Sequence, residues 1–105
     1  MPYLDVYLNH DARTAKSRPY VVDLQNDLLD DLPSTIIAPL ATPDSIEHKR
    51  ILRLNPDIRI NDTPLVLLTQ DMAAIPRFAL KHPIANLSAQ RENILAAIDF
   101  LFSGF

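Results

Sequence analysis

The chain has 105 residues, 48% apolar and 22% charged, which is enough for one domain (residues 1–105) with a single core. Its formal net charge of −3 argues against direct nucleic-acid binding by this chain alone, because phosphate binding normally needs a basic face. The absence of cysteine excludes a disulfide framework, a thiolate zinc site and a cysteine nucleophile.

Short strands are predicted for most of the chain that precedes its last quarter. Nine prolines interrupt the sequence and leave segments of about strand length between them. Runs of β-forming residues predict strands over residues 3–8, 19–25 and 35–40. Residues 9–17 are polar and predict a loop, whereas the aspartate-rich residues 26–34 predict a turn.

A proline in a predicted strand and a leucine pair in a predicted turn say more about these first elements. Pro39 lies inside a predicted strand and indicates an edge strand or a bulge, because proline cannot donate to the ladder. Leu28 and Leu29 stand between aspartates in the predicted turn. Either one of these leucines plugs the core, or the pair forms an exposed binding surface.

In the middle of the chain, residues 42–54 give no clear secondary-structure pattern, whereas residues 57–70 give clear strand patterns. Residues 42–54 are compatible with a short helical turn or with an irregular excursion. Residues 57–61 alternate and predict a strand, and residues 64–70 predict the most buried strand. Residues 71–80 are expected to extend that strand as a bent one, with Pro76 at an edge.

Residues 88–102 give the long helical pattern of this chain. Ser88 is a suitable N-cap, and Gly104 can take the left-handed conformation that ends a helix. The apolar residues of this segment are predicted to share one helical face. They are Ile94, Leu95, Ile98, Leu101, Phe102 and Phe105. Short strands followed by one terminal helix predict a small β-barrel or a bent sheet packed on a helix.

Neither membrane insertion nor export is predicted. No apolar run reaches the ~18 residues that a membrane helix needs. The first five residues lack the basic start and apolar core of a signal peptide. A cytoplasmic location without membrane contact is therefore expected.

Four segments, in order along the chain, resemble the CcdB toxins. Residues 21–30 resemble the second strand and following turn of that family, and residues 37–40 resemble its third strand. Residues 69–76 resemble its Thr-x-Asp-Met-Ala-Ser-Val-Pro segment. Residues 87–105 resemble its terminal helix and tail. The match in order and spacing extends over nearly the whole chain.

The resemblance implies a mostly β protein with one C-terminal α-helix, an SH3-like barrel of the CcdB/MazF/Kid kind. Members of the family are homodimers that bind the GyrA subunit of DNA gyrase and trap the enzyme on cleaved DNA. They are toxins of type II toxin–antitoxin systems, some of which act in plasmid maintenance. They do no covalent chemistry, so neither an enzyme activity nor a cofactor is expected here. A CcdA-like antitoxin neutralises the toxin, and the two together repress transcription of their operon, with the antitoxin supplying the DNA contacts.

The same resemblance implies two sets of site residues. The family's gyrase-binding surface is centred on the last three residues, and the best-known members end in Trp-Gly-Ile, whereas this chain ends in Ser-Gly-Phe. The implied gyrase-binding residues are Ser103, Gly104, Phe105, Asp99, Leu28 and Leu29, and the implied dimer-interface residues are Met72, Ile75, Pro76 and Phe102.

Each of these assignments has a purely structural alternative. Gly104 could serve only as a helix cap, with Phe105 folded back over the core. Met72 is equally compatible with core packing and with an interface. The aspartates of the predicted turns, with Asp71, suffice as turn-forming and solubilising residues, so no metal site is predicted.

A second class of function is an mRNA-cleaving toxin of the MazF/Kid type. Histidine as acid or base and arginine on the phosphate would carry that chemistry. The candidates are His10, His48, His82, Arg13, Arg18, Arg50 and Arg53. Those toxins share an early Arg-Gly-Asp motif, which this chain lacks because its one glycine is Gly104. A third reading is an inactive homologue that still binds an antitoxin.

Overall fold

A computed structural model describes residues 3–46 and 50–104. Within these ranges the chain forms seven strands, one α-helix and several short 3₁₀ turns. The elements are β1 (Asp5–Leu8), β2 (Tyr20–Asp23), β3 (Ser34–Ala41), β4 (Asp57–Ile60), β5 (Thr63–Leu67), β6 (Ala73–Pro76), β7 (Ala85–Asn86) and α1 (Arg91–Ser103).

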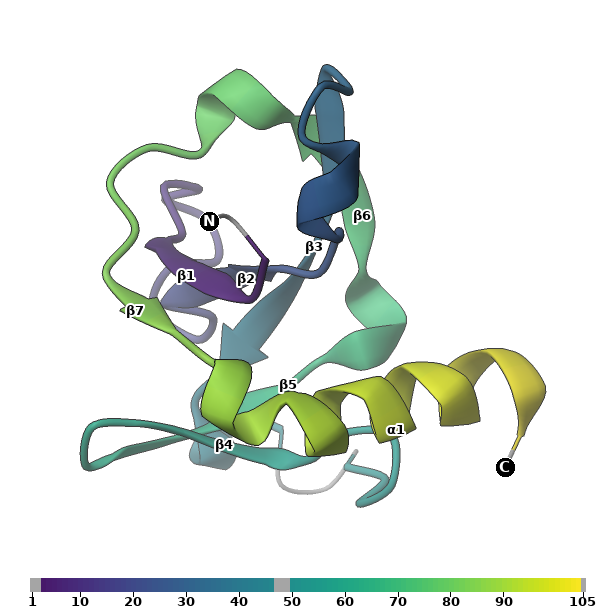
Figure 1. Cartoon of the computed structure of the whole chain (residues 1–105). Coiled ribbons are helices and arrows are strands. Elements are labelled where there is room, and N and C mark those ends of the chain that lie inside the picture. The colour runs from purple at the N-terminus through teal and green to yellow at the C-terminus, as the bar shows by residue number, and fades with distance from the viewer. Residues whose placement is uncertain (1–2, 47–49, 105) are drawn as a thin grey trace.

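The strands form one antiparallel sheet in the order β4-β5-β3-β2-β1-β7, and β6 pairs with β3 outside this path. The two halves of β3 have different partners on one side. Residues 34–37 pair with β6, whereas Leu40 and Ala41 pair with β5. The sheet therefore bends around β3 into a nearly closed barrel, and α1 lies across its open end (Figure 1). This confirms the predicted mostly β, SH3-like fold with a C-terminal helix.

Pro39 lies in the middle of a central strand, so of the two predicted alternatives, an edge strand or a bulge, the edge strand is wrong. It pairs with Val21 of β2 on one side, and on the other side its carbonyl accepts from the Leu68 N–H at 3.0 Å. In an extended strand the N–H and C=O of one residue point to the same side. The missing proline donor therefore falls where the partner of β3 changes from β6 to β5, so Pro39 accepts from Leu68 but returns no bond to it.

The core fills the inside of the bent sheet. Val6, Val22 and Leu40 come from adjacent strands, and Leu87 and Ile94 close the core from the helical side. All five side chains are buried. Each apolar side chain of this kind stabilises the fold by about 1.5–3 kcal/mol relative to exposure. Ile94 in the first turn of α1, with Leu87 just before the helix, thus anchors α1 on the sheet.

The buried face of α1 is narrower than predicted. Ile94 and Ala97 are buried, and Ile98 and Leu101 are half-buried, which is the i, i+3, i+4, i+7 stripe of an amphipathic helix. Leu95 and Phe102 lie beside this stripe and are exposed, so their assignment to the core face is wrong. Phe105 lies outside the described residues.

The predicted N-cap is also wrong. Ser88 begins a 3₁₀ turn, Ser88–Gln90, and α1 begins after it without a side-chain cap. Before this turn Asn86 closes a local turn of its own, because its Oδ1 accepts from the Ser88 N–H at 2.8 Å. At the other end Gly104 has φ +80° and donates to the Phe100 carbonyl at 3.0 Å, which confirms the predicted helix stop.

Residues 71–80 do not extend β5. The 3₁₀ turn Thr69–Asp71 ends that strand, β6 then pairs with β3, and a second 3₁₀ turn, Arg77–Ala79, follows. In the unclear segment 42–54 the structure has the 3₁₀ turn Pro43–Ser45, while residues 47–49 lie outside the description. Across the described ranges, no helix has both the length and the apolar character that crossing a membrane requires.

Candidate binding surface

An apolar groove of about 550 Å³ lies between the end of β2, β6 and α1. It contains members of both predicted site sets, because Leu29, Met72 and Phe102 all line it. Figure 1 shows how these elements surround the bent sheet, with α1 crossing below β6. The remaining lining residues are Leu24, Gln25, Asn26, Ile36, Ala73, Ala74 and Ile98.

The last turns of α1 project beyond the sheet (Figure 1). Phe102 is 74% exposed, and Asp99, Ser103 and Gly104 are exposed around it. The Ser103 hydroxyl donates to the Asp99 carbonyl at 2.6 Å, so this helix end is regular up to its glycine stop. A partner can therefore reach the predicted tail residues within the described range without displacing any core side chain.

Leu28 and Leu29 lie on the loop that joins β2 to β3, within the 3₁₀ turn Asp27–Leu29. Leu28 is 91% exposed and Leu29 is 46% exposed, so neither leucine plugs the core. Of the two readings of this pair, the exposed surface is the one that the structure supports. We call residues 24–33 the Leu28 loop.

The predicted dimer-interface residues do not share one face. Met72 and Phe102 line the groove described above. Ile75 points to the other side of β6, where it lines a separate hollow of about 320 Å³ with Leu8 and Leu80. Pro76 is exposed at the end of the strand. The alternation of side chains along a strand accounts for this division.

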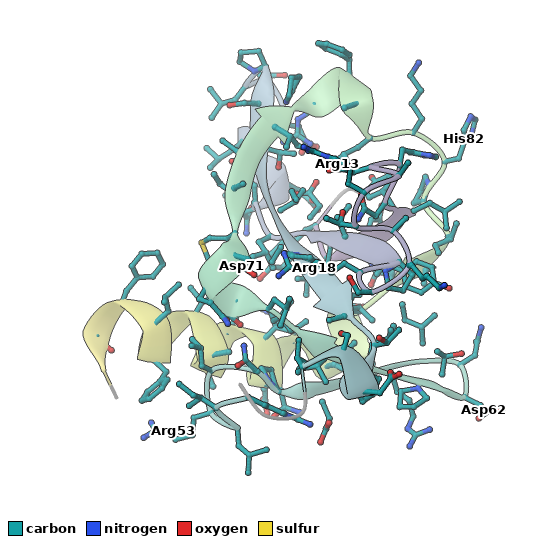
Figure 2. All side chains as sticks on the ribbon, turned by 180° about the vertical axis from the view of Figure 1, so that it is seen from behind. Arg13, Arg18, Arg53, Asp62, Asp71 and His82 are labelled. Carbon is teal, nitrogen blue, oxygen red and sulfur yellow. The ribbon has the colours of Figure 1, made fainter. Side chains whose placement is uncertain are left out.

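The histidines and arginines considered for RNA cleavage are dispersed. Figure 2 shows Arg53 beside the helix end and His82 near the opposite end of the molecule. The arginines also have other neighbours: Arg13 pairs with Asp11, Arg18 pairs with Asp71, Arg50 pairs with Asp57, and Arg53 lies over the Phe100 ring. His10 and His82 are exposed, and His48 lies outside the described residues. Three of the four arginines are thus paired with an aspartate, which leaves them less available to a phosphate.

A buried ion pair that the sequence did not suggest lies beneath the Leu28 loop. The side chain of Asp23, at the end of β2, is fully buried, and its Oδ2 lies 3.5 Å from Nη1 of Arg77. Its Oδ1 accepts from the Thr35 hydroxyl at 2.6 Å and from the Gln25 N–H at 3.1 Å. Burial raises the pKa of Asp23 above its usual range, while Thr35, Gln25 and Arg77 act to lower it. A lone aspartate within a strand was the one available signal for this site.

Burial and the nearby carboxylates of Asp5 and Asp23 raise the pKa of Tyr7. Among residues 3–46 and 50–104, no three histidine, aspartate or glutamate side chains gather so that they could hold a metal ion.

Two comparisons with known proteins agree with this geometry. The family model of the CcdB protein matches residues 3–104, nearly the whole chain. In the solved structures, the chain is similar to the Mycobacterium tuberculosis toxin MazF-mt6, with a TM-score of 0.65 and 22% sequence identity over 97% of this chain and 96% of that one. This second likeness shows a shared fold. The match to the family model over residues 3–104 places this chain in the CcdB family of toxin–antitoxin toxins.

Proposed function

We propose that this protein is a non-enzymatic poison of DNA gyrase. It binds the GyrA subunit of the enzyme, holds gyrase on cleaved DNA and is neutralised by a CcdA-like antitoxin. The single observation that carries the proposal is the exposed leucine pair of the Leu28 loop beside the projecting end of α1. Leu28 is 91% exposed and Leu29, which lines the groove, is 46% exposed, and such residues beside one groove are typical of a protein interaction site.

The proposed surface is completed by a second copy of the chain. In a homodimer, Met72 and Phe102 of each protomer lie near the two-fold axis, and the two helix ends form one composite face. A symmetric face suits gyrase, in which two copies of GyrA themselves form a dimer. Preferential binding to the DNA-cleaved state of gyrase would shift the enzyme toward that state, which is how a binder can poison it without covalent chemistry.

The C-terminal residues have a specific place in this proposal. The best-known family members carry tryptophan where this chain has Ser103, and an aromatic anchor normally supplies much of the binding energy at an interface. In this chain Phe105, which lies outside the described residues, supplies that anchor. The exposed Gly104 ends the helix just before this residue, in the left-handed conformation with φ +80°.

A gyrase cleavage assay tests the proposal. Purified toxin is mixed with gyrase, supercoiled plasmid and ATP, and linear DNA is scored after denaturation. We expect linear DNA with the wild type, its loss when residues 104–105 are deleted, and a reduction of about tenfold or more for Leu28→Ser. Ile84→Ser is the control, since Ile84 is an exposed apolar residue outside the groove. Absence of linear DNA at saturating wild-type protein would refute the gyrase assignment.

The likeness to MazF-mt6 keeps one other function open to test, cleavage of mRNA. The same protein preparation, incubated with single-stranded RNA, would give fragments under that alternative and none under the gyrase proposal. If neither DNA nor RNA is cleaved but a CcdA-like antitoxin still binds, the chain is an inactive homologue that titrates antitoxin.

A further inference from the structure

We infer that Arg77 is a positioning residue that holds the Leu28 loop in its binding shape. Arg77 follows β6 and lies forty-four or more residues further along the chain than the loop it contacts. The inference rests on the proposed function only where it assigns Leu28 and Leu29 to a binding surface.

Residues 26–33 of the Leu28 loop lack the packing that normally fixes a loop. Each of its residues from 26 to 33 is at least partly exposed. Its apolar pair faces outward, with Leu28 at 91% exposure. Without a buried side chain of their own, residues 26–33 depend on polar contacts to keep one conformation.

Arg77 supplies such contacts at both ends of the loop. Its N–H donates to the Pro33 carbonyl at 2.8 Å, and its Nε donates to the Leu32 carbonyl at 3.4 Å. Its Nη1 lies 3.5 Å from Oδ2 of Asp23, the residue that precedes the loop, and 4.0 Å from Oδ1 of Asp30. One planar guanidinium thus joins the start, the middle and the end of the loop, which a point charge such as lysine cannot do with the same geometry.

Asp23 connects Arg77 to the backbone of the loop and to the core. Besides facing Arg77, its carboxylate accepts from the Gln25 N–H at 3.1 Å and from the buried Thr35 hydroxyl at 2.6 Å. Oδ2 of Asp23 and Nη2 of Arg77 are buried and, among the residues that the structure describes, have no hydrogen-bond partner. These two groups therefore depend on each other's charge, and loss of either leaves the other uncompensated.

Other contacts close the loop independently of Arg77. Oδ1 of Asp27 accepts from the Tyr3 N–H at 2.8 Å, and Nε2 of Gln25 donates to the Ser34 carbonyl at 3.1 Å. Removal of the guanidinium should consequently loosen the loop without detaching it. The effect expected is local mobility of the leucine pair rather than a change of fold.

Amide hydrogen exchange measured by NMR tests the inference without any partner. In Arg77→Met the amides of Leu29, Asp30 and Leu32, which donate to carbonyls within the loop, are expected to exchange about tenfold faster than in the wild type. Amides of β5 exchange through global unfolding, so their rates show how far the variant lowers the stability of the whole protein, and the loop rates are corrected for that change. Arg77→Lys should rescue only part of the protection. Arg13→Met is the matched control, because Arg13 also pairs with an aspartate but in the exposed 9–17 loop.

A second variant keeps the test valid if the single substitution unfolds the protein. In Asp23→Asn/Arg77→Met both buried charges are removed together, so neither is left uncompensated. This variant should fold and show the same fast exchange in the Leu28 loop. Loop exchange equal to that of the wild type in a folded Arg77 variant would overturn the inference.

Gyrase binding supplies the second readout. If the proposed function holds, folded Arg77→Met binds GyrA about tenfold more weakly than the wild type, whereas Arg13→Met binds normally. If the wild type does not bind gyrase, the proposed function fails while the exchange experiment still decides the role of Arg77. Unchanged gyrase affinity in a variant with a loosened loop would overturn the assignment of Arg77 to binding.

Discussion

The charge of Asp23 is the residue-scale feature with the largest consequence. Its pKa is raised by burial, and Asp30 raises it further, while Thr35, Gln25 and Arg77 lower it. Since the folded-state pKa lies above that of the unfolded chain, the folded state binds this proton more tightly. The contribution of Asp23 to the free energy of unfolding therefore falls as pH rises from about 4, the ordinary aspartate value, through the raised folded-state pKa. Above that pKa it stays constant.

Arg77→Met removes a positive charge that lowers the pKa of Asp23. We expect the pKa of Asp23 to rise further in this variant, so that the loss of stability with increasing pH extends to higher pH. A ¹³C NMR titration of the side-chain carboxyl carbon measures the shift. Arg13→Met should leave it unchanged, because Arg13 pairs with Asp11 in a different loop. An unchanged or lower pKa in Arg77→Met would contradict the pairing of Asp23 with Arg77.

A second residue-scale prediction concerns the turn between β4 and β5. Ile60 pairs with Thr63, which leaves a two-residue turn, and Asn61 has φ +54°. Asparagine tolerates this left-handed conformation better than other residues with a Cβ atom. Asn61→Ala should therefore lower the free energy of unfolding by about 1 kcal/mol. Urea denaturation measures this change in the free energy of unfolding. Asp62→Ala, at the other residue of the turn, is the control. Equal stability of the two variants would argue against strain at residue 61.

At the scale of elements, the observed buried face of α1 predicts which truncations in the helix lower the free energy of unfolding. Ile94 is fully buried against the sheet, whereas its neighbour Leu95 is exposed. Ile94→Ala should cost about 2–5 kcal/mol, the range for truncation of a buried aliphatic side chain. Leu95→Ala should stay within about 0.5 kcal/mol of the wild type. Urea denaturation of the two variants distinguishes them, and a large loss for Leu95→Ala would restore the wider face that the sequence pattern suggested.

The elements also show where sequence patterns succeed and where they fail. Alternating strands and the glycine at the helix end are local features, and local patterns predict them correctly. The helical face is predicted too wide because a sequence pattern counts every apolar residue, and Leu95 and Phe102 are apolar but exposed. The pattern also omits the small Ala97, which is buried. The short strand β7 (Ala85–Asn86) carries too few residues for any pattern.

At the scale of the whole molecule, long-range pairing is beyond the reach of local patterns. The partner change along β3 explains how Pro39 fits a central strand, and it depends on β5 and β6 together. The contact of Arg77 with Asp23 joins residues far apart in the sequence. The exposed leucine pair and the helix end could be predicted from the family resemblance, but the residues that position them needed the fold.

The final prediction concerns dimer formation and follows from the apolar groove between β6 and α1. We expect the protein to be a homodimer in solution with Phe102 at the interface, because an exposed aromatic beside an apolar groove is stabilised when a second copy covers it. Phe102→Asp places a charge where water would be excluded and should raise the dimer dissociation constant at least about tenfold. Sedimentation equilibrium over a range of concentrations measures this constant.

Ile84→Asp is the matched control for assembly, because it puts the same charge on an exposed apolar residue outside the groove and should leave the dimer intact. The two variants separate a local interface from a general effect of added negative charge, which the chain already carries at −3. A monomeric wild type would remove the two-fold axis from the proposed gyrase surface. Each helix end would then act alone, and the deletion of residues 104–105 should affect gyrase cleavage without any dependence on Phe102.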